Sequence, residues 1–378
     1  MESRTILGNL ANKQLSMTSW LALRGANNKQ NVGGQITRSS ATSAKKVNLA
    51  GKIAKRTPIK LKSIKDDKSL KSTEVCVGDQ CMDIEISDDN TTVAIPEGVI
   101  DIDNEHGDES HLWGEYAPEI YAYLRHLESA NLIKDDYLRG CSITSKMRSL
   151  LVDWLVSVHQ QFELLPETLY RSVNILDRYL QLEGKNTQKD QLQLVGVVAM
   201  LLACKIEEIY LPTIDDFVYS TDNAYTEEEM KEQELKMMSV LNFNLTCPIP
   251  LNFLRRYSRA GDVDVLEHSL SKYILELCLM DYSQLAVCAS MSSAAALHLS
   301  LLLLEPSTRV WSPSLEYYSG YSSTMLMPLV KRMAAVLVNA EGHRLQAVRN
   351  KYCSRKFRRV ALLQELSEQF IAERVPLE

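Results

Sequence analysis

The sequence lacks several features that define whole classes of protein. Its eight cysteines include no C-x-x-C pair, and the closest two, Cys76 and Cys81, lie in a polar, acidic stretch. Such spacing favours reduced thiols in an intracellular protein over a disulfide framework or a structural metal site. The first residues, MESRTILGNL, contain no long apolar run, so we expect no secretory signal.

Strong basicity and recognisable catalytic groupings are missing as well. The 378 residues carry a net charge of −6 with a pI near 5.8, which argues against nucleic acid as the main partner. The sequence has no glycine-rich phosphate loop, nucleophile–base pair or metal-ligand cluster, and its histidines are scattered. We therefore expect no enzymatic activity, no cofactor and no metal. The length suits two domains with additional segments.

The longest apolar run, LQLVGVVAMLLACKIEE at 192–208, organises the rest of the chain. Up to Ile206 its only polar side chains are Gln193 and Lys205, so the predicted helix has no hydrophilic face. Other helices must therefore surround it. The run is shorter than the roughly 18 to 20 residues that a bilayer requires, so we expect no membrane partner.

Charge is distributed unevenly over the first third of the chain. Residues 1–65 hold 13 Lys/Arg and one acidic residue, whereas residues 66–119 hold 16 Asp/Glu and two lysines. Both stretches are rich in small polar residues and poor in aromatics, a composition typical of disorder. We predict a disordered regulatory tail over residues 1–112.

Two short motifs lie in this tail. Residues 4–12 read RTILGNLAN, which offers one cation, two apolar anchors and a turn-permitting glycine. A flexible segment with these features suits binding in a groove. The second motif, Thr57-Pro58-Ile59-Lys60, fits the pattern that proline-directed kinases phosphorylate at Thr57. The alternative for this motif is a solvated basic linker. The basic run 45–65 also fits a nuclear import signal.

Helical periodicity begins near Tyr116. The segment APEIYAYLRHLESA predicts one amphipathic helix, and KMRSLLVDWLVSVHQQF at 146–162 predicts another. The second has two apolar stripes: Met147, Leu150, Leu151 and Trp154 on one, and Val152, Leu155 and Phe162 on the other. Either both stripes are core, which the residues favour slightly, or one is an exposed docking patch.

Arg148 falls inside the apolar arc of that helix. A buried guanidinium requires a fixed carboxylate. Asp177 lies among apolar residues of the next predicted helix, ETLYRSVNILDRYLQ. We predict a structural ion pair between Arg148 and Asp177.

Side-chain spacing also predicts where two helices begin. Thr187 and Asp190 have the spacing of a capping box before the 192–208 helix, and Thr226 and Glu229 have it at the fifth helix.

A similar order of helices recurs after Pro248 and Pro250. LEHSLSKYILELCLMD predicts an amphipathic helix, and SQLAVCASMSSAAALHLSLLLL predicts a second buried helix comparable with 192–208. A third predicted helix contains Pro328 and stops at Gly342. Two five-helix units of about 100 residues, each with an apolar central helix, indicate an all-α fold with an internal duplication.

These residues resemble the cyclin family. MRSLLVDWLVSVHQQFELLPETLY, LQLVGVVAMLLACKIEEIYLP and FVYSTDNAYTEEEM are similar to the first cyclin box of A- and B-type cyclins. FLRRYSRAGDVDVLEHSLSKYILELCLMDY is similar to a B-type second box. The likeness covers about residues 116–360. It implies an N-terminal helix and first cyclin box at 113–246, and a second box with a C-terminal extension at 247–378.

The resemblance implies a non-catalytic regulatory subunit. Such a subunit binds and activates a mitotic cyclin-dependent kinase as a heterodimer, recruits R-x-L and phosphorylated substrates, and controls the G2/M transition. It moves between cytoplasm and nucleus. The alternatives are an A-type cyclin and a double-cyclin-fold transcription factor, which would need a basic groove for DNA.

The tail motif at residues 4–12 is similar to the destruction box read by the anaphase-promoting ubiquitin ligase. The matching residues are Arg4, Leu7, Gly8, Leu10 and Asn12.

The resemblance also assigns a kinase-binding surface, residue by residue. Lys205 and Glu234 match the pair that binds main-chain groups of the kinase C helix, a task that suits a cation donating to carbonyls and a carboxylate accepting from amides. The apolar floor beneath that helix matches Ile206, Met238, Phe243 and Leu245. Ile206 departs from the aromatic often found there. The contacts of the N-terminal helix match Tyr116 and Tyr123.

Two substrate sites are implied in the same way. The patch for R-x-L substrates matches Met147, Leu150, Leu151, Trp154 and Gln193, with Ser157 in place of the acid that some relatives carry beside it. Arg255, His268 and Lys272 resemble the phosphate pocket of B-type cyclins. His268 and Lys272, four residues apart, share a helix face, and three cationic donors can hold a phosphate. The alternative for these three is a solvated basic patch.

Overall fold

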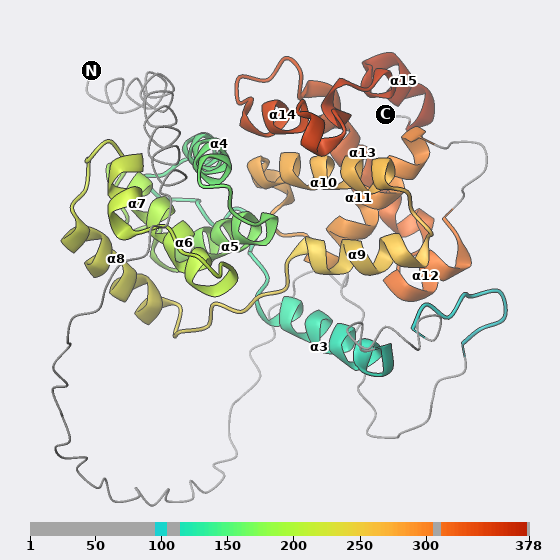
Figure 1. The fold of residues 1–378 in the computed structure, drawn as a ribbon, viewed down its shortest axis with the longest axis horizontal. Coiled ribbons are helices and arrows are strands. Elements are labelled where there is room, and N and C mark those ends of the chain that lie inside the picture. Colours follow the sequence, from blue (N-terminus) through green and yellow to red (C-terminus); the bar gives the residue numbers. More distant parts are fainter. Residues whose placement is uncertain (1–94, 104–113, 305–310, 376–378) are drawn as a thin grey trace, which may run out of the picture. The chain divides into compact units, whose positions relative to one another are not determined.

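The structure is a computed structural model that describes residues 95–103, 114–304 and 311–375. Within these ranges every regular element is a helix, which confirms the all-α fold with two tandem five-helix units (Figure 1). The destruction-box-like motif (Arg4, Leu7, Gly8, Leu10, Asn12) and Thr57 lie outside the described residues.

The helices follow the predicted order. One 3-10 turn, η1 (Gly114–Tyr116), leads into the N-terminal helix α3 (Ala117–Ala130). The first unit consists of α4 (Ser145–Gln161), α5 (Pro166–Glu183), α6 (Leu192–Glu207), α7 (Ile214–Ser220) and α8 (Glu227–Val240). The second unit consists of α9 (Pro250–Ala260), α10 (Val265–Met280), α11 (Ala289–Leu304), α12 (Pro313–Ser319) and α13 (Ser323–Asn339). A C-terminal extension contains α14 (Ala347–Tyr352) and α15 (Glu368–Arg374).

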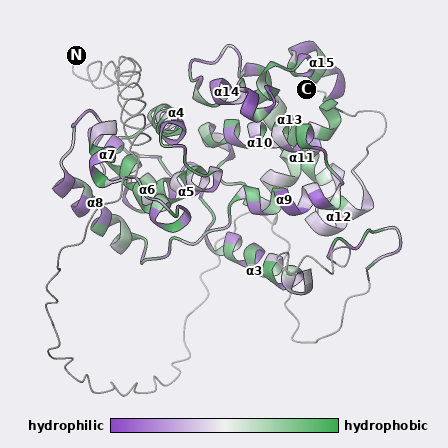
Figure 2. Ribbon diagram, in the orientation of Figure 1, coloured by the Kyte–Doolittle hydropathy of each residue, from purple (hydrophilic) through white to green (hydrophobic). Residues whose placement is uncertain are grey.

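Each unit is built around one buried helix. In the first unit α6 is buried continuously from Val195 to Cys204 and contacts α4, α5 and α8. In the second unit α11 contacts α9, α10 and α13. Both helices are mainly hydrophobic in Figure 2, whereas α8 and α14 carry hydrophilic stretches. The prediction of a central helix surrounded by others is therefore confirmed for both units.

A glycine allows α4 and α6 to approach closely. A Cβ atom added at Gly196 would lie 2.8 Å from Cδ1 of Leu151 on α4. Because that distance is shorter than carbon atoms tolerate, any larger residue at position 196 would push Leu151 aside.

Of the two helix caps expected from side-chain spacing, the structure contains one. The capping box of Thr226 and Glu229 is present at α8, as predicted. The capping box predicted for Thr187 and Asp190 is wrong, because the N-cap of α6 is Gln191 and makes no side-chain cap. The hydroxyl of Thr187 instead donates to the carbonyl of Glu183, 2.9 Å away, at the end of α5.

The helix α13 ends earlier than the sequence suggested. It continues through Pro328 and ends at Asn339 rather than at Gly342. Its C-cap is Ala340, whose amide donates to the carbonyl of Leu337.

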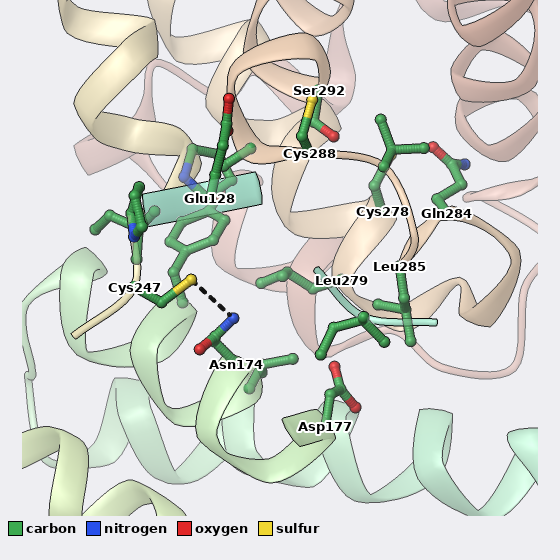
Figure 3. A pocket seen from close by; sticks show the side chains of 18 of the residues that line it. Glu128, Asn174, Asp177, Cys247, Cys278, Leu279, Gln284, Leu285, Cys288 and Ser292 are labelled. Atoms are coloured by element: carbon green, nitrogen blue, oxygen red, sulfur yellow. Dashed lines mark hydrogen bonds between the residues drawn. The ribbon is translucent and has the colours of Figure 1, made fainter. Parts of the chain in front are cut away.

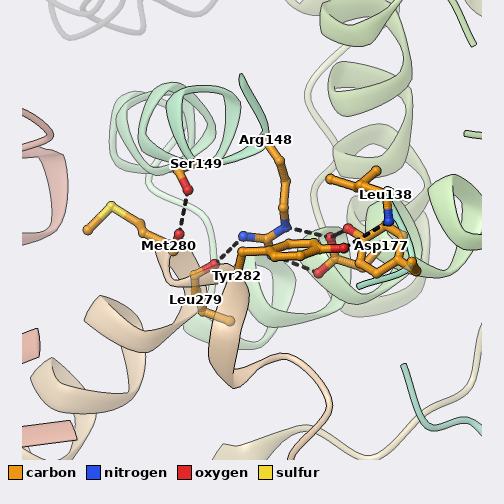
Figure 4. Close-up of polar contacts among 8 residues, drawn as sticks. Leu138, Arg148, Ser149, Asp177, Leu279, Met280 and Tyr282 are labelled. Carbon is orange, nitrogen blue, oxygen red and sulfur yellow. Dashed lines mark hydrogen bonds and ion pairs between the residues drawn. The ribbon is translucent and has the colours of Figure 1, made fainter. Parts of the chain in front are cut away.

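The predicted ion pair between Arg148 and Asp177 is confirmed, and it joins the two units (Figure 4). Nε and Nη2 of Arg148 each donate to one carboxylate oxygen of Asp177 at 2.7 Å, and Nη1 donates to the carbonyl of Leu279 at 2.7 Å. Burial alone would lower the pKa of Arg148, but the adjacent Asp177 raises it above its usual value. The guanidinium therefore remains charged between α4 and α5 of the first unit and α10 of the second.

A pocket of about 120 Å³, lined mainly by apolar surface, also lies between the two units (Figure 3). Its lining includes Glu128, Asn174 and Cys247, and the amide of Asn174 donates to the sulfur of Cys247 at 3.5 Å. Tyr170 Oη and Asn174 Oδ1 have no hydrogen-bond partner among the described residues. Because the pocket has room for water, an ordered water molecule can satisfy these two atoms.

Candidate functional site

Lys205 and Glu234 lie side by side at the surface of the first unit. Lys205 is in the last turn of α6, Glu234 is in the middle of α8, and Lys205 Nζ donates to Glu234 Oε1. The side chains are 44% and 19% exposed. Exposed ion pairs of this kind contribute at most about 1 kcal/mol. Both groups can therefore leave each other for a stronger partner at low cost.

Exposed apolar side chains border this pair. Ile206 follows Lys205 and is exposed, and Leu235 follows Glu234 and is exposed. Directly after α6, Ile209 and Tyr210 are 88% and 90% exposed. Large apolar residues so close together on a surface indicate a contact site for another protein.

Phe243 has an unusual backbone as well as an exposed ring. Its φ is +58°, in the left-handed region that bulky residues rarely adopt, and its side chain is 71% exposed. Its amide donates to the carbonyl of Met238 at 2.9 Å, so the ring is anchored at the end of α8. Of the other predicted floor residues, Met238 is half-buried and Leu245 is buried.

The N-terminal helix α3 offers a third group of exposed side chains. Tyr116, Ile120 and Tyr123 are all exposed and recur at the spacing of one helix face. Other positions of α3 hold the helix to the second unit: Glu128 accepts from Ser290, and the hydroxyl of Tyr121 donates to the carbonyl of Asn252. The helix is therefore fixed while its apolar face remains accessible.

The predicted R-x-L patch is less exposed than the family resemblance implied, and closer to the core interpretation that the residues slightly favoured. Leu151 and Trp154 are buried, whereas Met147, Leu150 and Gln193 are half-buried. On the opposite stripe Val152 and Leu155 are also buried. Each stripe therefore contributes two residues to the core. The accessible part of the patch is formed by the three half-buried residues, of which Gln193 has its amide nitrogen buried.

The three side chains of the predicted phosphate pocket lie together on the second unit. Arg255 on α9 is exposed, and His268 and Lys272 on α10 are half-buried. Burial, together with the charges of Lys272 and Arg255, lowers the pKa of His268 to about 4. The hydroxyl of Ser258 is 2.8 Å from His268 Nδ1 and fixes the ring. The imidazole is therefore neutral at physiological pH, and the expectation of three cationic donors is wrong at His268.

Sequence reasoning missed several residues of these surfaces. Glu167 on α5 forms an ion pair with Arg255, across 88 positions of sequence, and no local pattern indicates that contact. Ile209, Tyr210 and Leu235 were missed too. Leu235 directly follows Glu234, and Ile209 and Tyr210 come within five residues of Lys205, which was a usable signal.

The described residues contain none of three other features that often define a protein's function. No three His, Cys, Asp or Glu side chains in this part of the chain are arranged to bind a metal ion. No disulfide joins two of the cysteines in ranges 114–304 and 311–375. No helix in the described ranges has the length and apolar character needed to span a bilayer.

Comparisons with known proteins agree with this architecture. Residues 119–246 match the family described as cyclin, N-terminal domain, and residues 248–366 match cyclin, C-terminal domain. The chain is similar to a viral cyclin from herpesvirus saimiri, with a TM-score of 0.50 and 19% identity over 56% of this chain and 95% of that one. That likeness supports the fold.

Curated relatives are closer in sequence. G2/mitotic-specific cyclin-B2 of Anguilla japonica is 39% identical over 98% of this chain and 91% of its own length. G2/mitotic-specific cyclin-B of Marthasterias glacialis is 45% identical over 73% of this chain and 71% of its own. Human G2/mitotic-specific cyclin-B2 is 40% identical over 77% and 74%.

The tandem helical units and these relatives show that the chain belongs to the cyclin family. Its relatives are G2/mitotic-specific B-type cyclins, which confirms the B-type prediction over the A-type alternative. Membership of this group gives the chain a regulatory role at G2/M.

Proposed function

We propose that the protein is the non-catalytic subunit of a heterodimer with a mitotic cyclin-dependent kinase, which it activates. The observation that carries this proposal is the exposed Lys205–Glu234 pair, bordered by exposed apolar side chains. Family resemblance supplies the identity of the partner, and the surface supplies the means of binding it.

Lys205 and Glu234 together can bind main-chain groups at the end of a partner's helix or along an exposed part of its backbone. A lysine ammonium donates hydrogen bonds to carbonyls, and a glutamate accepts them from amides, each worth about 1.5 to 3 kcal/mol when the group is charged. Ile206, Leu235 and Phe243 supply apolar area around the polar contacts. Together they can hold the kinase C helix inward, which completes the Lys–Glu pair that orients ATP.

Substrate recruitment is the second part of the proposal. Met147, Leu150 and Gln193 form the accessible part of a patch for R-x-L substrates, supported by the buried Leu151 and Trp154. Arg255, His268 and Lys272 receive phosphorylated substrates. The motif at residues 4–12 directs degradation through the anaphase-promoting ubiquitin ligase, Thr57 is a phosphorylation site, and the protein moves between cytoplasm and nucleus.

The proposal is tested by recovering the partner. The tagged full-length chain is purified from dividing cells and assayed for protein kinase activity with and without an inhibitor of the kinase ATP site. We expect co-purified activity that the inhibitor abolishes, and no activity from the isolated recombinant chain. Phosphoryl transfer by the isolated chain, or recovery without any kinase, would contradict the proposal.

A further inference from the structure

The cation cluster of the second unit is already occupied by a carboxylate of the first. Glu167, in the first turn of α5, accepts a hydrogen bond from Nη2 of Arg255 on α9. It is also near enough to Lys272 for the pKa of each group to respond to the charge of the other. The pair is partly exposed, with Arg255 the more accessible member.

The electrostatics of the four groups follow from their surroundings. Burial alone would raise the pKa of Glu167, but the hydrogen bond and charge of Arg255 lower it below its usual value, so the carboxylate is ionised. His268 is neutral because its pKa is about 4. Burial lowers the pKa of Lys272, whereas the charges of Glu276 and Glu167 raise it. The cluster thus has two basic side chains and one carboxylate.

A second carboxylate near Lys272 cannot take the same part. Glu276 is buried and accepts hydrogen bonds from Lys351 Nζ at 2.7 and 2.8 Å and from the hydroxyl of Tyr352 at 2.8 Å. It is therefore fixed in the core. Glu167 is the carboxylate of the cluster that can move away when a ligand arrives.

We propose that Glu167 is an internal competitor that occupies the site until a phosphate-bearing peptide displaces it. This inference rests on the phosphate-docking function proposed above. A carboxylate ligand would only replace one carboxylate by another, and the internal one has the advantage of a high effective concentration. A phosphoserine brings a charge of about −1.5 to −2 and three acceptor oxygens, enough for Arg255, Lys272 and His268 together. Glu167 thereby lowers the affinity of the site for every ligand, so that a phosphate still binds whereas a single carboxylate does not.

The arrangement of His268 agrees with this ligand. Its bond to Ser258 uses Nδ1, which leaves Nε2 as the ring nitrogen that can meet a phosphate oxygen. Displacement of Glu167 also exchanges a contact between α5 and α9 for contacts with the ligand. The site therefore has one state closed by its own side chain and one state opened by phosphate.

The test uses the full-length chain and its Glu167→Gln variant. The probes are a labelled peptide with one phosphoserine, and an unlabelled peptide with glutamate at that position, measured by competition against the first. Glu167→Gln should raise the affinity for both peptides by the same factor, about two- to fivefold, because an exposed ion pair is worth at most about 1 kcal/mol. Glu341→Gln, which breaks the exposed pair with Arg349, is the matched control and should change neither affinity.

Other outcomes of this binding experiment would show which part of the inference is wrong. If Glu167 stays in place and acts only as a nearby charge, the gain for the phosphopeptide will be about the square of the gain for the glutamyl peptide. If Glu167 positions Arg255, Glu167→Gln will weaken both. Either result, or no change in either affinity, overturns the inference. Phosphate docking at this site still stands in those cases if Arg255→Ala weakens phosphopeptide binding. If neither wild type nor Glu167→Gln binds the phosphopeptide, phosphate docking itself fails.

Discussion

Removing the carboxylate of the buried ion pair should destabilise the protein severely. Asp177→Ala leaves the guanidinium of Arg148, which is fully buried, with the carbonyl of Leu279 and without its carboxylate. It also removes the acceptor of the Tyr137 hydroxyl, which is 2.7 Å from Asp177 Oδ1. Breaking a buried pair by removing one partner costs about 3 to 5 kcal/mol. We expect a loss of that size in the free energy of unfolding.

The assay is urea unfolding of the full-length chain followed by circular dichroism at helical wavelengths. Replacing both partners, as Arg148→Met with Asp177→Leu, should recover most of the loss, because apolar residues of similar volume often replace a buried pair without cost. The exposed pair variant Glu341→Gln should change stability by less than about 1 kcal/mol. A loss below about 1 kcal/mol for Asp177→Ala, or a double variant as unstable as the sum of the single ones, would refute this reasoning.

Three further predictions concern docking, pH and turnover. Leu150→Ala should slow phosphorylation of R-x-L substrates and leave other substrates unaffected. Leu150 is the better choice because it is half-buried, whereas truncating the buried Trp154 would cost about 3 to 5 kcal/mol of stability. Equal slowing of both substrate types would contradict this prediction. Burial raises the pKa of Glu128 from 4.5 to about 7, so the stability that its protonated form contributes below pH 4.5 should be lost as the pH rises through 7. The loss should be roughly 3 kcal/mol at most. Urea titrations at pH 5 and pH 8 should show this loss for the wild type and not for Glu128→Gln. Arg4→Ala with Leu7→Ala should stabilise the protein through mitotic exit, measured by immunoblot in synchronised cells; unchanged turnover would locate the degron elsewhere.

The parts of the fold that follow from local pattern were predictable. Hydrophobic periodicity located α6 because a helix without a polar face must be buried, and the Thr226 capping box fixed the start of α8. Arg148 and Asp177 were predictable as partners because each was a charge on an apolar face. The Thr187 cap failed because its hydroxyl bonds back to α5, and spacing alone cannot distinguish the end of one helix from the start of the next.

The site was predictable only in part. The identities of Lys205 and Glu234 came from family resemblance, and their contact depends on how α6 and α8 pack, which no local pattern states. Exposure was the weakest inference: the family resemblance assigned Trp154 to a docking patch, whereas the residues slightly favoured a core position, and Trp154 is buried. The contact between Glu167 and Arg255 joins two units, so it required coordinates.

The most direct test of the account is kinase activation by the full-length chain carrying Lys205→Ala and Glu234→Ala. Both side chains are partly exposed, so the variant should keep the helical circular dichroism and unfolding midpoint of the wild type. It should fail to activate the co-purified kinase, because the two charged groups that hold the kinase helix are gone. Activation equal to that of the wild type would contradict the central claim that this pair grips the kinase.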